Sequence, residues 1–392
     1  MKITRMSAWL VVAAAGLWLP VAAPVFAQNA PECPAVFKGV RASEITLSPC
    51  GEFLAAAGYQ DETDEAIALL IVWNLKTKKE VFRHRDPEGG FETVAFRPDS
   101  KLLAAAGVGS LKTAKVWEFP SGKEIARLQS DEIVDCLRFS PDGKFLAMTT
   151  RVPEPEDDAR GQRAAIVFFD TEKFKKTVTL RAYEKTISKL AFSHDGKDVI
   201  AGDAGGVLHC WSWRFRNEGD FPTFRERIAR LLSVNVATES NASRWESMLR
   251  AVAFGNASNL CASGGGRGQI QVITDLTDPD KMAKVHKLLP ALTGNEDAFI
   301  LSLAFSPDDK WLFASGCELP PGKKFGVVGT LQVWNVAEKK LHVDLLKDVK
   351  YLVLSMAISR DGRTLVAGCN DATVRVWALP KEFHASAPKG QQ

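Results

Sequence analysis

The amino-acid sequence predicts an all-β protein, a seven-bladed β-propeller whose blades have four strands each. Two short motifs carry this prediction, because each recurs seven times along the 392 residues. One is a turn, best represented by Phe-Ser-Pro-Asp-Gly at 139–143, and the other is an apolar strand that usually ends in tryptophan. The pair recurs about every 40 to 60 residues, with several short strands in each interval, which is typical of propeller blades.

Residues 1–27 are expected to be a secretory signal peptide that precedes this fold. Lys2 and Arg5 come before an apolar run at 8–19, and Val25 and Ala27 are the small residues at –3 and –1 that suit cleavage after Ala27. A membrane anchor is the alternative, but the run is shorter than the ~20 residues that a membrane span needs. We therefore expect a periplasmic or secreted protein with no membrane segment after cleavage.

The turn motif joins the first two strands of each blade. An alternating strand such as 133–139 enters the turn, and a short apolar strand such as 101–106 leaves it, which predicts a hairpin. Proline presets φ in such a turn, aspartate bonds the backbone, and glycine takes positive φ. The seven turns lie at 47–51, 96–100, 139–143, 192–196, 254–258, 305–309 and 358–362.

The third strand of each blade ends in the second motif, and a fourth strand follows a polar turn, as at 79–82, 123–128 and 341–345. The segment 226–233 resembles 124–130 in sequence, so we expect it to be the outer strand of blade 4. An amphipathic helix over 222–233, capped by Thr223 and Glu226, is the alternative. The third strands end at Trp73, Trp117, Phe169, Trp211, Ile273, Trp334 and Trp377.

The two ends of the chain are expected to meet in the last blade. After Trp377, the polar tail at 381–392 makes a poor outer strand, whereas residues 36–41 precede blade 1 and lack a partner. We predict that the N-terminal strand completes blade 7 and so removes an exposed sheet edge. The propeller domain then spans 28–380.

These paired motifs resemble those of the WD40-repeat family, in a divergent and exported form, over residues 43–379. The family's Gly-His pair is missing from every blade, and its buried aspartate before the third strand is recognised only as Asp371. The resemblance therefore implies a propeller whose blades pack mainly through apolar contacts, and a protein that acts as a scaffold. The turn motif is also similar to that of Tol-type periplasmic propellers, which predicts the same architecture.

Charge and cysteine content exclude some classes of function. A net charge of +3 offers no basic footprint for nucleic acid. No CxxC pair or Cys/His cluster is present, so no zinc site is predicted. We expect three cysteines to be buried in strands and four to be disulfide candidates of unassigned pairing. The first group is Cys136, Cys210 and Cys261, and the second is Cys33, Cys50, Cys317 and Cys369.

The long loops that differ between blades are the candidates for partner binding, because loops on a rigid scaffold carry function. They lie at 58–65, 151–163, 235–246 and 317–325, and we expect them to share one face, called here the loop face. Tolerated, solvated insertions are the alternative. The candidate binding residues are Tyr59, Asp61, Glu62, Arg151, Glu154, Glu156, Trp245, Lys323, Lys324 and Phe325.

Signs of catalysis or cofactor binding are not found in the sequence. The six histidines are scattered, no Gly-x-Ser-x-Gly is present, and the acidic residues at 61–65 lack EF-hand spacing. The glycines at 264–268 are expected in a hairpin turn of blade 5 rather than a phosphate loop. We therefore predict no catalytic, metal or cofactor residues, and expect a monomeric, non-catalytic scaffold that binds a protein or peptide through the loop face. An enzyme, or a small-ligand or metal binder that uses the central channel, is the alternative.

Overall fold

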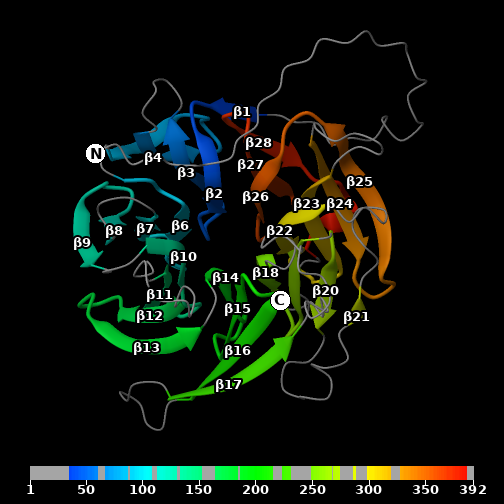
Figure 1. Cartoon of the computed structure of the whole chain (residues 1–392). Helices are drawn as coiled ribbons and strands as arrows, with labels where there is room; N and C mark the ends of the chain where they lie inside the picture. Colours follow the sequence, from blue (N-terminus) through cyan, green and yellow to red (C-terminus); the bar gives the residue numbers. More distant parts are fainter. Residues whose placement is uncertain are drawn as a thin grey trace, which may run out of the picture.

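The described residues of the computed structural model form seven four-stranded antiparallel sheets, arranged as blades around a central axis (Figure 1). This confirms the predicted all-β, seven-bladed propeller. The structure describes residues 35–60, 67–86, 89–107, 113–129, 133–151, 164–183, 186–214, 223–230, 249–266, 268–273, 286–287, 298–318 and 327–385.

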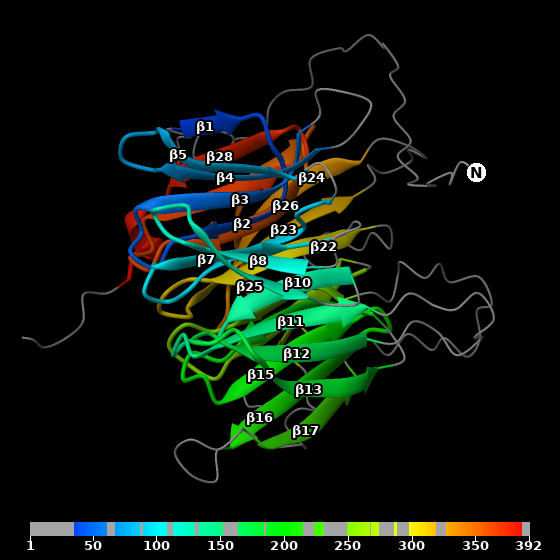
Figure 2. The same ribbon diagram turned by 90° about the vertical axis from the view of Figure 1, so that its left-hand side faces the viewer.

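Each blade runs from an inner strand at the channel to an outer strand at the rim. In blades 1 to 3 the strands are β2 (Arg41–Leu47), β3 (Phe53–Gln60), β4 (Ile67–Asn74) and β5 (Glu80–Asp86); β6 (Thr93–Phe96), β7 (Leu102–Ala106), β8 (Thr113–Glu118) and β9 (Glu124–Gln129); β10 (Ile133–Phe139), β11 (Phe145–Arg151), β12 (Ala164–Asp170) and β13 (Lys176–Tyr183). Figure 2, a view turned by 90°, shows strands of these three blades, such as β3, β8 and β12, stacked one above another.

The other four blades repeat this order. Their strands are β14 (Ile187–Phe192), β15 (Asp198–Asp203), β16 (Val207–Arg214) and β17 (Thr223–Arg230); β18 (Leu249–Phe254), β19 (Cys261–Gly265), β20 (Ile270–Ile273) and β21 (His286–Lys287); β22 (Phe299–Phe305), β23 (Trp311–Glu318), β24 (Val328–Asn335) and β25 (Lys340–Val349); β26 (Val353–Ile358), β27 (Thr364–Cys369), β28 (Thr373–Ala378) and β1 (Ala35–Lys38). Strand β17 confirms the outer strand predicted for blade 4 over residues 226–230, and the described residues 223–230 form no helix; residues 222 and 231–233 lie outside the described part.

The N-terminal strand closes the ring, as predicted. Strand β1 pairs antiparallel with β28, from Ala35 opposite Val376 to Lys38 opposite Thr373. The ends of the described chain are thus held in one sheet, and the outer edge of β28 is covered. Just beyond β28, the 3-10 turn η2 (Lys381–Phe383) begins the segment expected to be a polar tail, and Phe383 is buried against the rings of Phe313 and Trp311.

The third-strand motif packs the blades against one another. Trp211 of blade 4, for example, lies in an apolar cluster with Phe168 and Cys136 of blade 3. Trp334 of blade 6 likewise lies in an apolar cluster with Ile270 of blade 5. All seven strand-ending residues are buried, so their apolar area stabilises the ring rather than a binding site.

The turn motif is a hydrogen-bonded structural unit. The Ser140 hydroxyl donates to the Asp142 carboxylate at 2.5 Å and accepts from the Phe145 amide at 3.0 Å. The same carboxylate accepts from the Lys144 amide at 3.0 Å, and Gly143 takes a φ of 71°. Blades 4, 6 and 7 repeat these bonds from Ser193, Ser306 and Ser359. This accounts for the recurrence of serine and aspartate without any reference to function.

The prediction that the buried aspartate survives only as Asp371 is wrong. Asp371 has a side chain that is 34% exposed, because Arg375 on the same hairpin holds the carboxylate at the surface through two hydrogen bonds. The buried aspartate is Asp203 in blade 4, which accepts from two backbone amides of its turn and lies 3.1 Å from the ring nitrogen of His209.

The prediction of disulfides is also wrong for the described candidates. Cys50, Cys317 and Cys369 are free thiols, and Cys317 and Cys369 lie buried at the ends of strands β23 and β27. Burial raises the pKa of each of these two thiols to about 11. Cys33 lies outside the described residues. The three cysteines expected to be buried in strands are buried.

Candidate functional site

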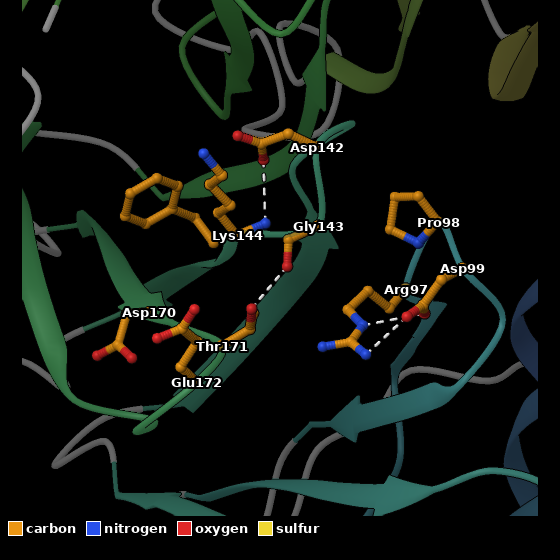
Figure 3. Close-up of a pocket in the computed structure, with 10 residues that line it drawn as sticks. Arg97, Pro98, Asp99, Asp142, Gly143, Lys144, Asp170, Thr171 and Glu172 are labelled. Carbon is orange, nitrogen blue, oxygen red and sulfur yellow. Dashed lines mark hydrogen bonds and ion pairs between the residues drawn. The ribbon is translucent and has the colours of Figure 1, made fainter. Parts of the chain in front are cut away.

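A cleft of about 670 Å³ lies between blades 2 and 3, at the ends of the strands that carry the turn motif. Three turns surround it, the β6–β7, β10–β11 and β12–β13 turns, as Figure 3 shows. We call it the turn cleft. Its lining residues are Arg97, Pro98, Asp99, Asp142, Gly143, Lys144, Phe145, Asp170, Thr171 and Glu172.

Local hydrogen bonds hold each wall of the turn cleft in place. Arg97 replaces the motif serine in blade 2 and donates two bonds to Asp99, at 2.9 and 2.7 Å. Asp170 accepts from the backbone amides of Lys173 and Lys175, at 2.6 and 2.9 Å. Each wall is therefore preorganised before any ligand arrives, which is what a binding site on a scaffold requires.

Close contacts join the walls at the base of the cleft. The Thr171 hydroxyl donates to the carbonyl of Gly143 at 2.6 Å, and so connects two turns of blade 3 (Figure 3). A Cβ atom at Gly143 would lie 3.3 Å from Cγ of Arg97 in blade 2. Glycine thus serves both the positive φ of the turn and the close approach of the neighbouring blade.

The turn cleft is acidic, with an apolar part. Arg97 neutralises Asp99, which leaves three carboxylates against the single ammonium group of Lys144. Burial acts to raise the pKa of Asp99, but hydrogen bonds from Arg97 and the Lys101 amide outweigh it and lower that pKa. Pro98 and the half-buried ring of Phe145 supply apolar surface. The three uncompensated carboxylates are Asp142, Asp170 and Glu172.

A second group of charges lies in the central channel. Glu44 on β2, Arg138 on β10 and Lys189 on β14 are here called the channel cluster; Arg138 donates a hydrogen bond to Oε1 of Glu44, and Nζ of Lys189 lies 3.5 Å from the same oxygen. Attraction from both cations outweighs the burial of Glu44, which by itself would raise the pKa, and lowers the pKa of this carboxyl to about 2. The Glu44 carboxyl is thus ionised in neutral solution.

The described parts of the chain contain neither a metal-binding cluster nor a membrane-spanning helix. Those residues contain no group of three or more His, Cys, Asp or Glu side chains that could hold a metal ion. Over the same residues, no helix has the length and apolar character needed to cross a membrane.

Most of the residues predicted from the sequence to bind a partner lie outside the described residues. Tyr59 is at the end of β3 and donates a hydrogen bond to the Glu92 carboxylate, and Arg151 ends β11, opposite Ile133 and Ala164. Both lie at the strand ends opposite the turn cleft. The residues outside the described part are Asp61, Glu62, Glu154, Glu156, Trp245, Lys323, Lys324 and Phe325.

Sequence reasoning missed the turn cleft, because it assigned the recurring turn to structure alone. Two departures were visible in the sequence: Arg97 stands where five of the other six blades have serine, and Glu172 adds an acid near Asp170. Neither shows by itself that the turns of two blades enclose a space.

The fold and the turn cleft define a seven-bladed propeller with a preformed, acidic surface cleft. Comparison with family models then finds WD40, the WD domain or G-beta repeat, at residues 174–212, 286–318 and 347–378. Each matched stretch begins in the outer strand of one blade and continues into the inner strands of the next. The chain thus carries matches to the WD40 repeat in blades 4, 6 and 7 of its seven-bladed propeller.

Curated relatives match over part of their length. MST50-interacting protein 11 of Pyricularia oryzae is 26% identical over 152 residues, which cover 36% of this chain and 44% of the relative. Small ribosomal subunit protein RACK1 of Neurospora crassa shows the same values. Telomerase protein component 1 of Rattus norvegicus is 26% identical over 147 residues, 37% of this chain but 5% of the relative. The chain thus spans less than half the length of each of these relatives.

Proposed function

We propose that the protein is a non-catalytic scaffold that binds a basic, partly apolar peptide segment of another protein in the turn cleft. The observation that carries this proposal is the cleft itself, where acidic walls of rigid turns flank the apolar surface of Pro98 and Phe145. WD40 propellers are generally protein-interaction scaffolds, which supports this class of function. Fold by itself would be weak support, so the proposal depends on the site.

The charges of the cleft favour a cationic ligand. Asp142 and Asp170 already accept backbone hydrogen bonds, so each carboxylate is oriented, and Glu172 extends from the rim without a hydrogen bond to any described residue. A lysine or arginine of a peptide can pair with these acids while its aliphatic stem covers the Phe145 ring. A rigid site of this kind loses little conformational entropy on binding.

Export and use of the loop face are part of the same proposal. The signal-like residues 1–27 support export, and the length and composition of the segments 151–163 and 317–325 support a second contact surface. The scaffold would then offer two opposite faces, the turn cleft and the loop face, to one or two partners.

Fluorescence anisotropy with short labelled peptides tests the turn cleft directly. The chain without residues 1–27, here called the mature chain, should bind a peptide rich in lysine and leucine at least tenfold more tightly than an acidic peptide of the same length. Glu172→Lys should weaken that binding about tenfold, because it reverses a charge at the rim. Glu338→Lys is the control, since Glu338 lies in the corresponding turn of blade 6, away from the cleft.

A third variant distinguishes the two faces. Replacing residues 152–163 by glycine and serine removes a predicted contact of the loop face and leaves the turn cleft intact. Equal binding by wild type and Glu172→Lys, together with loss of binding in the loop variant, would place the peptide site on the loop face and reject the cleft.

A further inference from the structure

The channel cluster joins blades that are not neighbours. Strands β2, β6, β10 and β14 follow one another around the ring, each packed on the next, with β6 between β2 and β10. A side-chain contact from Glu44 on β2 to Arg138 on β10 or Lys189 on β14 therefore runs through the channel rather than through an interface between blades. Two cations from different blades are thus brought together inside the ring.

The Glu44 carboxylate orients the side chains of Arg138 and Lys189. Its side chain is only 4% exposed, and one carboxylate oxygen interacts with both Arg138 and Lys189. The Thr93 hydroxyl, which accepts from the Leu137 amide at 3.1 Å, stands beside the carboxylate. One negative charge therefore faces two positive charges, and the cluster keeps a formal charge of +1.

Arg138 and Lys189 have further N–H groups that can donate to a ligand. One terminal nitrogen of Arg138 donates to the Glu44 carboxylate, and the other donates to the carbonyl of Leu137 at 2.7 Å. Lys189 makes a single long contact of 3.5 Å with Glu44, and no other described residue accepts a bond from its ammonium group. The side chains of Arg138 and Lys189 are 31% and 27% exposed, so both reach solvent in the channel.

On the inner strands of the other blades, the positions equivalent to Arg138 carry short side chains. Arg138 stands immediately before the turn motif of blade 3, and the other six blades have alanine or threonine at that position. Among the inner strands, Arg138 is thus the one long side chain at this level. The corresponding residues are Thr46, Ala95, Ala191, Ala253, Ala304 and Ala357.

We propose that Arg138 and Lys189 bind a small oxyanion, a phosphate or carboxylate group, in the central channel. The planar guanidinium and the ammonium group both donate to oxyanions, and charge-assisted bonds of this kind are among the strongest in proteins. The low dielectric of the channel wall strengthens the attraction further. Glu44 acts as a positioning residue, because it holds both cations without contacting the ligand.

Isothermal titration calorimetry of the mature chain with sodium phosphate, at constant ionic strength, tests this site. Wild type should bind phosphate with one-to-one stoichiometry. Lys189→Met should weaken binding at least tenfold, whereas Lys189→Arg should keep it within about threefold. Lys197→Met is the matched control on the same blade, since the Lys197 side chain is 76% exposed in a turn and should leave binding unchanged.

A parallel titration with sodium acetate distinguishes the two sources of the oxyanion, because the tighter ligand identifies the group that the site prefers. The thermal midpoint of each variant shows that it is folded, and its rise with phosphate gives a second readout of binding. Absence of saturable binding of both anions to wild type, or equal affinity in Lys189→Met and wild type, would overturn the proposal.

Discussion

Replacing Glu44 by glutamine should destabilise the protein in a way that depends on pH. Glutamine keeps the shape of the side chain but removes the charge that holds Arg138 and Lys189 together across the channel. The pKa of Glu44 falls from its ordinary value of 4.5 to about 2 in the folded protein. A shift of this size corresponds to about 3 kcal/mol of stability that depends on the ionised carboxylate.

The sign of the pH dependence follows from the direction of the shift. Because the pKa is lower in the folded state, the contribution of Glu44 is fully present above the unfolded value of 4.5 and is lost as pH falls toward about 2. The difference between wild type and Glu44→Gln should thus be about 3 kcal/mol at pH 7 and less than half of that at pH 3.

Urea unfolding of both proteins at the two pH values measures this difference. Glu80→Gln is the control, because Glu80 pairs with Arg83 at the surface of β5, where an ion pair contributes little. A destabilisation below about 1 kcal/mol at pH 7, or one that stays the same at pH 3, would refute the reasoning.

Four other predictions concern the fold and its thiols. Ser306→Ala should cost about 1 kcal/mol, measured by urea unfolding, because the first amide of β23 loses its acceptor. Phe383→Ala should cost about 3 kcal/mol in the same assay, since that ring is buried between blades 6 and 7, and an effect near zero would show that η2 is not docked. Deletion of 28–38 should lower the thermal midpoint and promote association, because β28 becomes an open edge. Cys50→Ser should remove one equivalent of fast thiol reaction with Ellman's reagent, whereas Cys317 should react only after unfolding.

The fold could be predicted because its two motifs act locally. The serine of the turn motif bonds an amide five residues later, as Ser140 does with Phe145, so the same physical need recurs in the same sequence pattern. The buried strand-ending residues, such as Trp211, recur for the same reason. Closure by β1 followed from counting strands, because an unpaired strand and an incomplete blade are each unfavourable.

The candidate sites could not be predicted, because they form only when distant blades meet. Glu44 is 94 residues from Arg138 and 145 residues from Lys189, and only closure of the ring brings them together. The turn cleft likewise depends on how closely Gly143 approaches the side chain of Arg97 in the next blade. Local patterns do not contain this information.

Contacts with neighbouring groups explain why the sequence analysis assigned the buried aspartate to Asp371 rather than Asp203. Asp371 and Asp203 both precede a third strand, but a nearby arginine draws Asp371 outward, whereas backbone amides and His209 hold Asp203 inside. The sequence pattern at each position is compatible with either outcome, and only the neighbouring side chains decide between them.

Hydrogen–deuterium exchange of the mature chain with the bound lysine- and leucine-rich peptide tests the central claim most directly. Binding in the turn cleft should protect the amides of Arg97, Asp99, 142–145 and 170–172, and Glu172→Lys should strongly reduce this protection at the same peptide concentration. Protection confined to the loop face, at residues 58–65, 151–163 and 317–325, would contradict the account.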